Sequence, residues 1–201
     1  MLQALVVFVD VDTQVDFLIP SGRLFVPGAT EIVENLRRLT EFARRRTILI
    51  IASACAHRAD DNEFQLFPPH CMRGTPGQRR IAETEHASAA IIGVAPDADA
   101  AAKFERARAV VLEKEKFDFF SNPNAEQVIA AVPDAEFVVY GVATDFCVKA
   151  AVIGLRDRGR RVAVVRDAIR PVDAKQGEAA IAEFTRRGVR LVTAAEVCRD
   201  S

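Results

Sequence analysis

The sequence predicts a three-layer α/β/α fold, doubly wound around a central, mostly parallel sheet of six strands. Short apolar segments alternate with segments of helical periodicity, which indicates a parallel sheet covered by helices on both faces. A length of 201 residues suits a single domain, residues 1–201, and half of the residues are hydrophobic, which argues against disorder. The 27 basic and 28 acidic residues nearly cancel, which argues against a nucleic-acid partner bound through a basic field.

The first quarter of the chain predicts two buried strands and one helix. Residues 5–11 (LVVFVDV) and 47–52 (TILIIA) are continuous apolar runs, as expected for strands covered on both faces. Between them, residues 30–46 place apolar side chains on one helical stripe, with acidic residues near the start and three arginines at the end. Residues 54–80 are polar and aperiodic, and a loop of that length is usually functional.

The rest of the chain continues the alternation. Gly159 and Gly188 each follow a helical pattern, as is common where a helix ends. The predicted strands cover residues 108–113, 136–140, 161–166 and 189–192, and the predicted helices cover residues 124–132, 145–158 and 173–187.

The cysteine content and the hydropathy of the sequence indicate the cellular compartment of the protein. The four cysteines are irregularly spaced, which favours a reducing compartment, so we expect a cytoplasmic protein. No apolar run approaches the roughly 18 residues of a membrane span, so no membrane partner is expected.

In sheets of this kind, ligands bind outside the carboxyl ends of the strands. Chemistry is therefore expected just after Val11, Ala52, Glu113 and Tyr140. The sequence has neither a GxGxxG loop nor a GxxxxGK[ST] loop, which argues against dinucleotide and P-loop nucleotide binding.

Three of these strand ends carry groups suited to nucleophilic catalysis. Asp12 could be a general base or only a turn former. Lys114 and Lys116 share one face of a strand, and either could stabilise a thiolate, although a solvated charge run is the simpler interpretation. Cys147 is expected near a helix N-terminus, where free N–H groups lower a thiol pKa and can bind an oxyanion; the alternative is an inert buried cysteine.

A second group of side chains suggests a metal site. Cys55 and His57 lie two residues apart in an extended segment, so their side chains can converge. His70 lies in a Pro-Pro-His-Cys string, and Glu63 lies between. These four residue types bind zinc or a similar divalent ion, but their spacing matches no structural zinc motif, and ordinary buried or surface side chains remain the alternative.

Six strings together resemble the isochorismatase-like cysteine hydrolases, and within them the nicotinamidase branch, along nearly the whole chain. In order they are DVDTQVDF, GRLFVPGA, FPPHCMRGTPGQ, EKEKFDFFSNP, GVATDFCV and VVRDAIRP. The resemblance implies a catalytic triad of Asp12, Lys114 and Cys147. It also implies a cis peptide at Val142–Ala143 and an oxyanion hole formed by the N–H groups of Ala143 and Cys147.

The resemblance also implies a metal. His57 and His70 match the family's metal-binding histidines, and Glu63 matches a position that often contributes. Cys55 stands where the family has aspartate. Because a thiolate is a softer ligand, the substitution favours zinc over iron or manganese; alternatively, it leaves the site weakened or empty.

The expected substrate is a small carboxamide. Phe17 and Phe67 match positions that pack against the substrate ring, with Phe67 in place of a frequent tryptophan. The resemblance implies hydrolysis of nicotinamide to nicotinate and ammonia through a thioester. Two alternatives remain: a metal-independent hydrolase of a carbamoyl compound, ureide or isochorismate, and a catalytically silent binding protein on the same fold. Similar proteins are often dimers or tetramers, so a homo-oligomer is expected.

Overall fold

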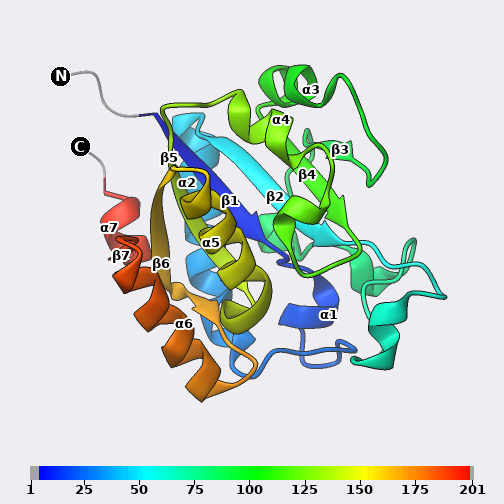
Figure 1. The fold of residues 1–201 in the computed structure, drawn as a ribbon. Helices are drawn as coiled ribbons and strands as arrows, with labels where there is room; N and C mark the ends of the chain where they lie inside the picture. Colours follow the sequence, from blue (N-terminus) through cyan, green and yellow to red (C-terminus); the bar gives the residue numbers. More distant parts are fainter. Residues whose placement is uncertain (1–4, 200–201) are drawn as a thin grey trace.

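The computed structural model describes residues 5–199, which form a three-layer α/β/α domain around one fully parallel sheet (Figure 1). Across the sheet the strand order is β3-β4-β2-β1-β5-β6-β7. The strands are β1 (Val6–Val11), β2 (Leu49–Cys55), β3 (Ala90–Ile92), β4 (Ala109–Lys114), β5 (Glu136–Val142), β6 (Arg161–Arg170) and β7 (Arg190–Val192). The parallel α/β prediction is confirmed, with seven strands in place of six.

The helices cover both faces of the sheet. They are α1 (Val15–Leu18), α2 (Val33–Arg46), α3 (Ala100–Ala107), α4 (Ala125–Ala130), α5 (Lys149–Asp157), α6 (Ala174–Arg186) and α7 (Ala194–Val197). Buried side chains of α3, α4, α5 and α6 belong to one apolar core, and those of α2 and α7 belong to a second. Figure 1 shows α5 and α2 on opposite sides of the sheet.

Two predicted helices begin differently from expectation. The stretch predicted as a helix over 145–158 is a π-helical turn, Thr144–Val148, followed by α5. The helix predicted over 30–46 opens with a 3₁₀ turn, Ala29–Ile32, before α2. The apolar stripe of α2 is confirmed, because its buried side chains include Leu36 and Leu39.

The strand order brings the site together. The four central strands are β4, β2, β1 and β5, so their carboxyl ends lie side by side at one edge. That edge carries Asp12, Cys55, Lys114 and the turn after Val142. Residues distant in sequence therefore meet where the sequence places its candidate chemistry.

The long segment after β2 covers this edge. It contains the 3₁₀ turns Asn62–Gln65, Pro76–Gln78 and Ala82–Thr84, and in Figure 1 it extends beyond the arrowheads of β1 and β2. A buried ion pair between Arg80 and Asp10, 2.5 Å long, ties its far end to β1.

The buried carboxylate of Asp16 ties down this segment near the site. It accepts hydrogen bonds from the backbone N–H groups of Arg23 (3.1 Å) and Cys71 (2.6 Å). Gly22 and Gly77 pack so closely on Asp16 that an added Cβ would come within 2.4 Å of its carbonyl oxygen and 2.2 Å of its carboxylate, respectively. Two connecting segments, the one after α1 and the one after β2, therefore meet at Asp16.

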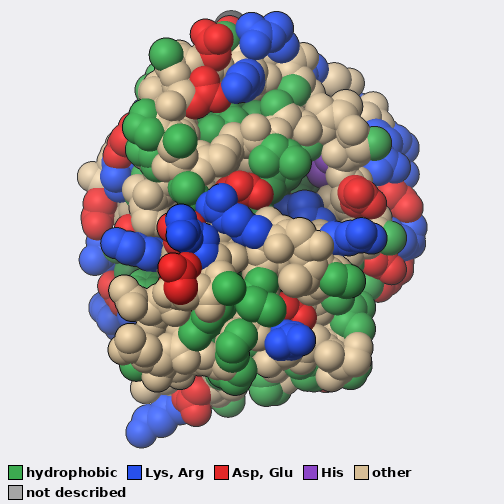
Figure 2. Space-filling view, turned by 90° about the vertical axis from the view of Figure 1, so that its right-hand side faces the viewer, with side chains coloured by type: hydrophobic (Ala, Val, Ile, Leu, Met, Phe, Trp, Pro, Cys, Tyr) green, Lys and Arg blue, Asp and Glu red, His purple; other side chains and the backbone are tan. Residues whose placement is uncertain are grey.

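The surface shows no broad field of one charge on the face in Figure 2, where basic and acidic side chains are interspersed. In residues 5–199, no helix has the length and hydropathy needed to cross a membrane.

Candidate active site and metal site

Asp12 and Lys114 form a buried ion pair at the carboxyl edge of the sheet. Asp12 directly follows β1, and Lys114 is the last residue of β4. The Lys114 Nζ lies 2.8 Å from Asp12 Oδ2, while the Ser53 hydroxyl donates a 2.7 Å hydrogen bond to Asp12 Oδ1. All three side chains are buried, so the ion pair is shielded from solvent.

Cys147 completes the cluster. It lies in the π-helical turn after β5, and its Sγ is 3.6 Å from Lys114 Nζ. The structure thus brings Asp12, Lys114 and Cys147 together as the resemblance implied. It also distinguishes the two lysines, because Lys116 is exposed and forms no ion pair among the described residues. The peptide between Val142 and Ala143 is cis, as expected.

Cys55 belongs to the same cluster, which the sequence did not predict. Its Sγ is 3.1 Å from Lys114 Nζ, the same ammonium that lies 3.6 Å from the Cys147 Sγ. The Gln14 side chain holds Cys55 in place, because its Oε1 accepts from the Cys55 N–H and its Nε2 donates to the Cys55 carbonyl, both at 2.8 Å. Lys114 therefore links the catalytic candidates to the metal candidates.

The surroundings move the pKa values of the two thiols apart. The neighbouring Cys147 and the charge of Lys114 hold the pKa of Cys55 well below its usual range, despite burial. The neighbouring Cys55, together with burial, raises the pKa of Cys147. The lowered thiol pKa expected at Cys147 is therefore wrong, because these two effects outweigh the charge of Lys114.

The ion pair is perturbed as well. Burial, followed by the negative charge of Cys55, raises the pKa of Asp12 above its ordinary value, although Lys114 opposes this shift. Burial alone would lower the pKa of Lys114, but the charges of Asp12 and the two cysteines raise it well above its usual range. Lys114 is therefore a permanent ammonium at the centre of the site.

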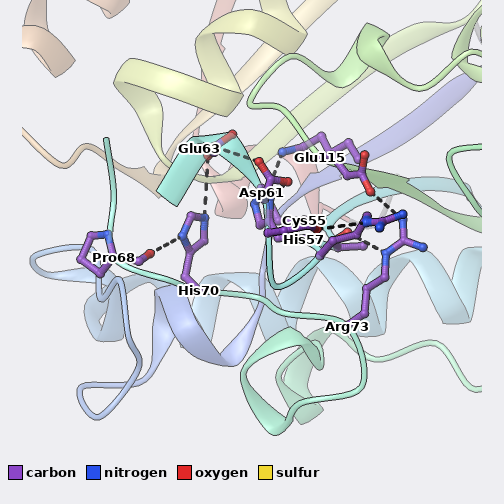
Figure 3. A network of polar contacts seen from close by, with 12 residues as sticks. Cys55, His57, Asp61, Glu63, Pro68, His70, Arg73 and Glu115 are labelled. Carbon is purple, nitrogen blue, oxygen red and sulfur yellow. Dashed lines mark hydrogen bonds and ion pairs between the residues drawn. The ribbon is translucent and has the colours of Figure 1, made fainter. Parts of the chain in front are cut away.

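Three potential metal ligands converge beside this cluster (Figure 3). One ligand atom from each of Cys55, His57 and His70 lies within 4.8 Å of the others, and all three residues are buried. His57 Nδ1 is 2.9 Å from Asp61 Oδ2, whereas the buried Nε2 of His57 has no hydrogen-bond partner. A histidine that binds a metal typically has one ring nitrogen hydrogen-bonded to a carboxylate and the other ring nitrogen free to coordinate the ion.

His70 is oriented in the same way. Its Nδ1 donates to the Pro68 carbonyl at 2.9 Å, which leaves Nε2 as the acceptor. Glu63 stands further out, with Oε1 3.8 Å from His70 Nε2, and is not part of the three-residue group. Burial lowers the pKa of His57, but negative charge on the neighbouring Cys55 and the hydrogen bond to Asp61 outweigh this and raise it to about 9. The residues present fit a divalent ion with one thiolate and two imidazole ligands.

A cavity of about 120 Å³ opens onto both clusters. Phe17, Phe67, Ala143 and Cys147 line it, as expected for the ring-packing and oxyanion positions. The Phe17 and His70 rings lie 5.3 Å apart. The remaining lining residues are Leu24, Val26, Cys55, Glu63, His70, Phe117, Val142, Phe146 and Val172. The cavity therefore offers an apolar slot with the Cys147 sulfur in its wall.

Sequence reasoning missed the residues that support the site. Asp61 follows His57 by four residues in a loop, and this proximity was the one available local signal. Ser53 and Gln14 act across neighbouring strands, and Cys55 is paired with Lys114 in the register of β2 and β4. Strand register is not visible in a single sequence, so these contacts could not be predicted.

Comparisons with known proteins found similarity along nearly the whole chain. The family model described as "Isochorismatase domain" matches residues 3–196. A nicotinamidase of Escherichia coli (strain K12) is 28% identical over 216 residues, covering 92% of this chain and 93% of that protein.

Solved structures have the same fold. The pyrazinamidase of Pyrococcus horikoshii, solved in complex with zinc, has a TM-score of 0.77 at 22% identity, covering 94% of this chain and 99% of that one. The N-carbamoylsarcosine amidase of Thermoplasma acidophilum has a TM-score of 0.72 at 26% identity, covering 94% and 95%.

Proposed function

The chain belongs to the isochorismatase family, in its nicotinamidase-like branch, and from this premise we propose that it is a cysteine-dependent amidohydrolase of small carboxamides. Nicotinamide, hydrolysed to nicotinate and ammonia, is the best candidate reaction. The observation that carries the proposal is the contact of one buried ammonium, Lys114, with both Asp12 and Cys147 beside a small cavity.

In the proposed mechanism, Asp12 accepts the proton of Cys147 as the substrate enters. The raised pKa of Asp12 makes it a stronger base than an ordinary aspartate, and Lys114 stabilises the thiolate as it forms. The Cys147 sulfur then attacks the carboxamide carbon, and Asp12 returns the proton to the departing ammonia. Water activated by Asp12 hydrolyses the remaining thioester.

The developing oxyanion is assigned to the backbone N–H groups of Ala143 and Cys147. Both residues line the cavity, next to the attacking sulfur. One such donor is worth about 3 kcal/mol in transition-state stabilisation.

Cys55, His57 and His70 would hold a divalent ion. Because the Cys55 thiolate is a soft ligand, the site would prefer zinc. When bound, the ion supplies a Lewis acid that anchors a ring nitrogen of the substrate. Glu63 and Phe17 shape the cavity next to these ligands.

The metal assignment is tested by metal analysis and by cobalt substitution. We expect Co²⁺ to give a thiolate-to-cobalt absorption band in the wild type but not in Cys55→Asp, and this variant should shift its preference toward manganese or iron. A cobalt spectrum without a sulfur band in the wild type would contradict the assignment of Cys55.

A second candidate function is hydrolysis of a carbamoyl compound or ureide. The structural likeness to an N-carbamoylsarcosine amidase supports it. The slot is mainly apolar, which favours a flat ring over a small polar ureide.

An ammonia-release screen over nicotinamide, pyrazinamide and small ureides separates the candidates. We expect nicotinamide to be turned over fastest and Cys147→Ala to abolish turnover. Cys198→Ala is the matched control, because Cys198 lies far along the chain and contacts a backbone carbonyl of α2. Substantial activity in Cys147→Ala would overturn the nucleophile assignment, and activity on ureides alone would select the second candidate.

We also propose that the enzyme works in the cytoplasm. The support is that the four cysteines are all free, as expected in a reducing compartment.

A further inference from the structure

Two cysteine sulfurs meet at one ammonium in this site. Lys114 Nζ lies 3.1 Å from the Sγ of Cys55 and 3.6 Å from the Sγ of Cys147, so both sulfurs contact the same ammonium. Their elements are far apart in sequence, since Cys55 ends β2 and Cys147 lies after β5. The fold therefore holds both sulfurs against one ammonium before any oxidation.

A small oxidant can reach this pair. Both cysteines line the 120 Å³ cavity, and the cavity shares Glu63, Phe67 and Phe117 with an open cleft of about 550 Å³. Among the described residues, the two remaining cysteines approach backbone carbonyls and neither contacts the Lys114 ammonium. The Cys71 Sγ approaches the Gly77 carbonyl (3.8 Å), and the Cys198 Sγ approaches the Arg38 carbonyl (3.9 Å).

We propose that Cys55 and Cys147 form a reversible disulfide when a peroxide enters the cavity, and that this bond switches the enzyme off. Cys147 gives its proton to Asp12 and its sulfur attacks the peroxide; the O–O bond breaks, the departing hydroxide takes up that proton, and the products are a sulfenic acid and water. The Cys55 sulfur then attacks the sulfenic sulfur and releases a second water. In total, two thiols are oxidised and one peroxide is reduced to two waters.

The disulfide would block both the proposed catalytic site and the proposed metal site. It occupies the proposed nucleophile, Cys147, and withdraws the proposed thiolate ligand, Cys55. It also shields Cys147 from further oxidation to sulfinic acid, which is not reversed by thiol reductants. The disulfide thus inactivates the enzyme reversibly, because a reductant restores both cysteine thiols.

The test treats the purified protein with hydrogen peroxide and reads thiols, peptides and activity. We expect the free thiol count to fall from four to two, and mass spectrometry to find one peptide pair joined through Cys55 and Cys147. Amide hydrolysis, scaled to each protein's untreated rate, should fall at least about tenfold and return with a reductant.

Cys198→Ala and Cys55→Ser are the paired controls. Cys198→Ala should form the same cross-link, whereas Cys55→Ser should form none and should lose activity that a reductant does not restore. Separate oxidised peptides in the wild type, or full recovery in Cys55→Ser, would overturn the proposal. The peptide readout needs no substrate, so a cross-link in a protein that hydrolyses no amide would refute the proposed function and leave the disulfide standing.

Discussion

At the scale of single residues, the site depends on Lys114. Its ammonium contacts Asp12, Cys55 and Cys147, which are the proposed base, metal ligand and nucleophile. The sequence alone left Lys114 and Lys116 equivalent by periodicity. The structure separates them by burial, because one is enclosed with three partners and the other faces solvent.

Lys114→Met should reduce kcat/KM at least about 100-fold, because the developing thiolate loses its counter-charge in a buried site. Lys116→Met removes an exposed ammonium two residues away and should change the rate little. Steady-state kinetics on both variants, with circular dichroism to confirm folding, provide the measurement. Equal losses in the two variants would contradict the assignment.

The acid limb of the pH profile of kcat/KM should report Asp12. As the base, Asp12 must be ionised, so activity is lost as the pH falls through its folded pKa. Burial, followed by Cys55, raises that pKa, which places the limb above the ordinary aspartate value of 3.8. A rate profile from acid to neutral pH measures the limb, and a midpoint at or below 3.8 would refute this role.

At the scale of elements, the sequence predicts helices with a clear hydrophobic period and strands with a continuous apolar run, but it misses short helices and strands. β3 has three residues and α3 eight, both in a stretch without a clear hydrophobic period. β2 continues to Cys55 and β6 to Arg170, beyond their apolar runs, because pairing with β4 and β5 carries the strands past the apolar residues. Propensity alone does not reveal such tertiary support.

Gly141 in β5 shows how closely two strands approach at the site. Its φ is +115°, and an added Cβ would lie 2.0 Å from the Val11 carbonyl oxygen. Gly141→Ala should therefore lower the melting temperature far more than Gly159→Ala. Gly159 also has a positive φ but has open space around it, so its variant should lose only about 1–3 kcal/mol. Thermal unfolding compares them, and equal shifts would show that the backbone contact is unimportant.

At the scale of the whole molecule, one parallel sheet collects the site from strands that span most of the chain. The fold class could be predicted because apolar runs alternate with helical patterns. The proximity of Asp12, Lys114 and Cys147 was expected from the family resemblance, with each residue at or after a strand end. The contact of Cys55 with Lys114 could not, because it depends on the register between β2 and β4. The supporting Gln14 and Ser53 depend on the same cross-strand geometry.

Assembly remains a prediction at this scale. We expect a dimer or tetramer, since exposed large hydrophobic side chains include Leu66, Ile91 and Phe117. Light scattering coupled to size-exclusion chromatography measures the mass in solution. A single species of 22.0 kDa at all concentrations would contradict the expectation.

The packing of Gly22 and Gly77 on Asp16 bears on how the pocket can be re-engineered. A side chain at position 77 would collide with the Asp16 carboxylate that fastens the neighbouring loops, and one at position 22 would collide with the Asp16 backbone. Mutant libraries aimed at new amides should keep these three positions constant and vary the rim at Leu24 and Val172.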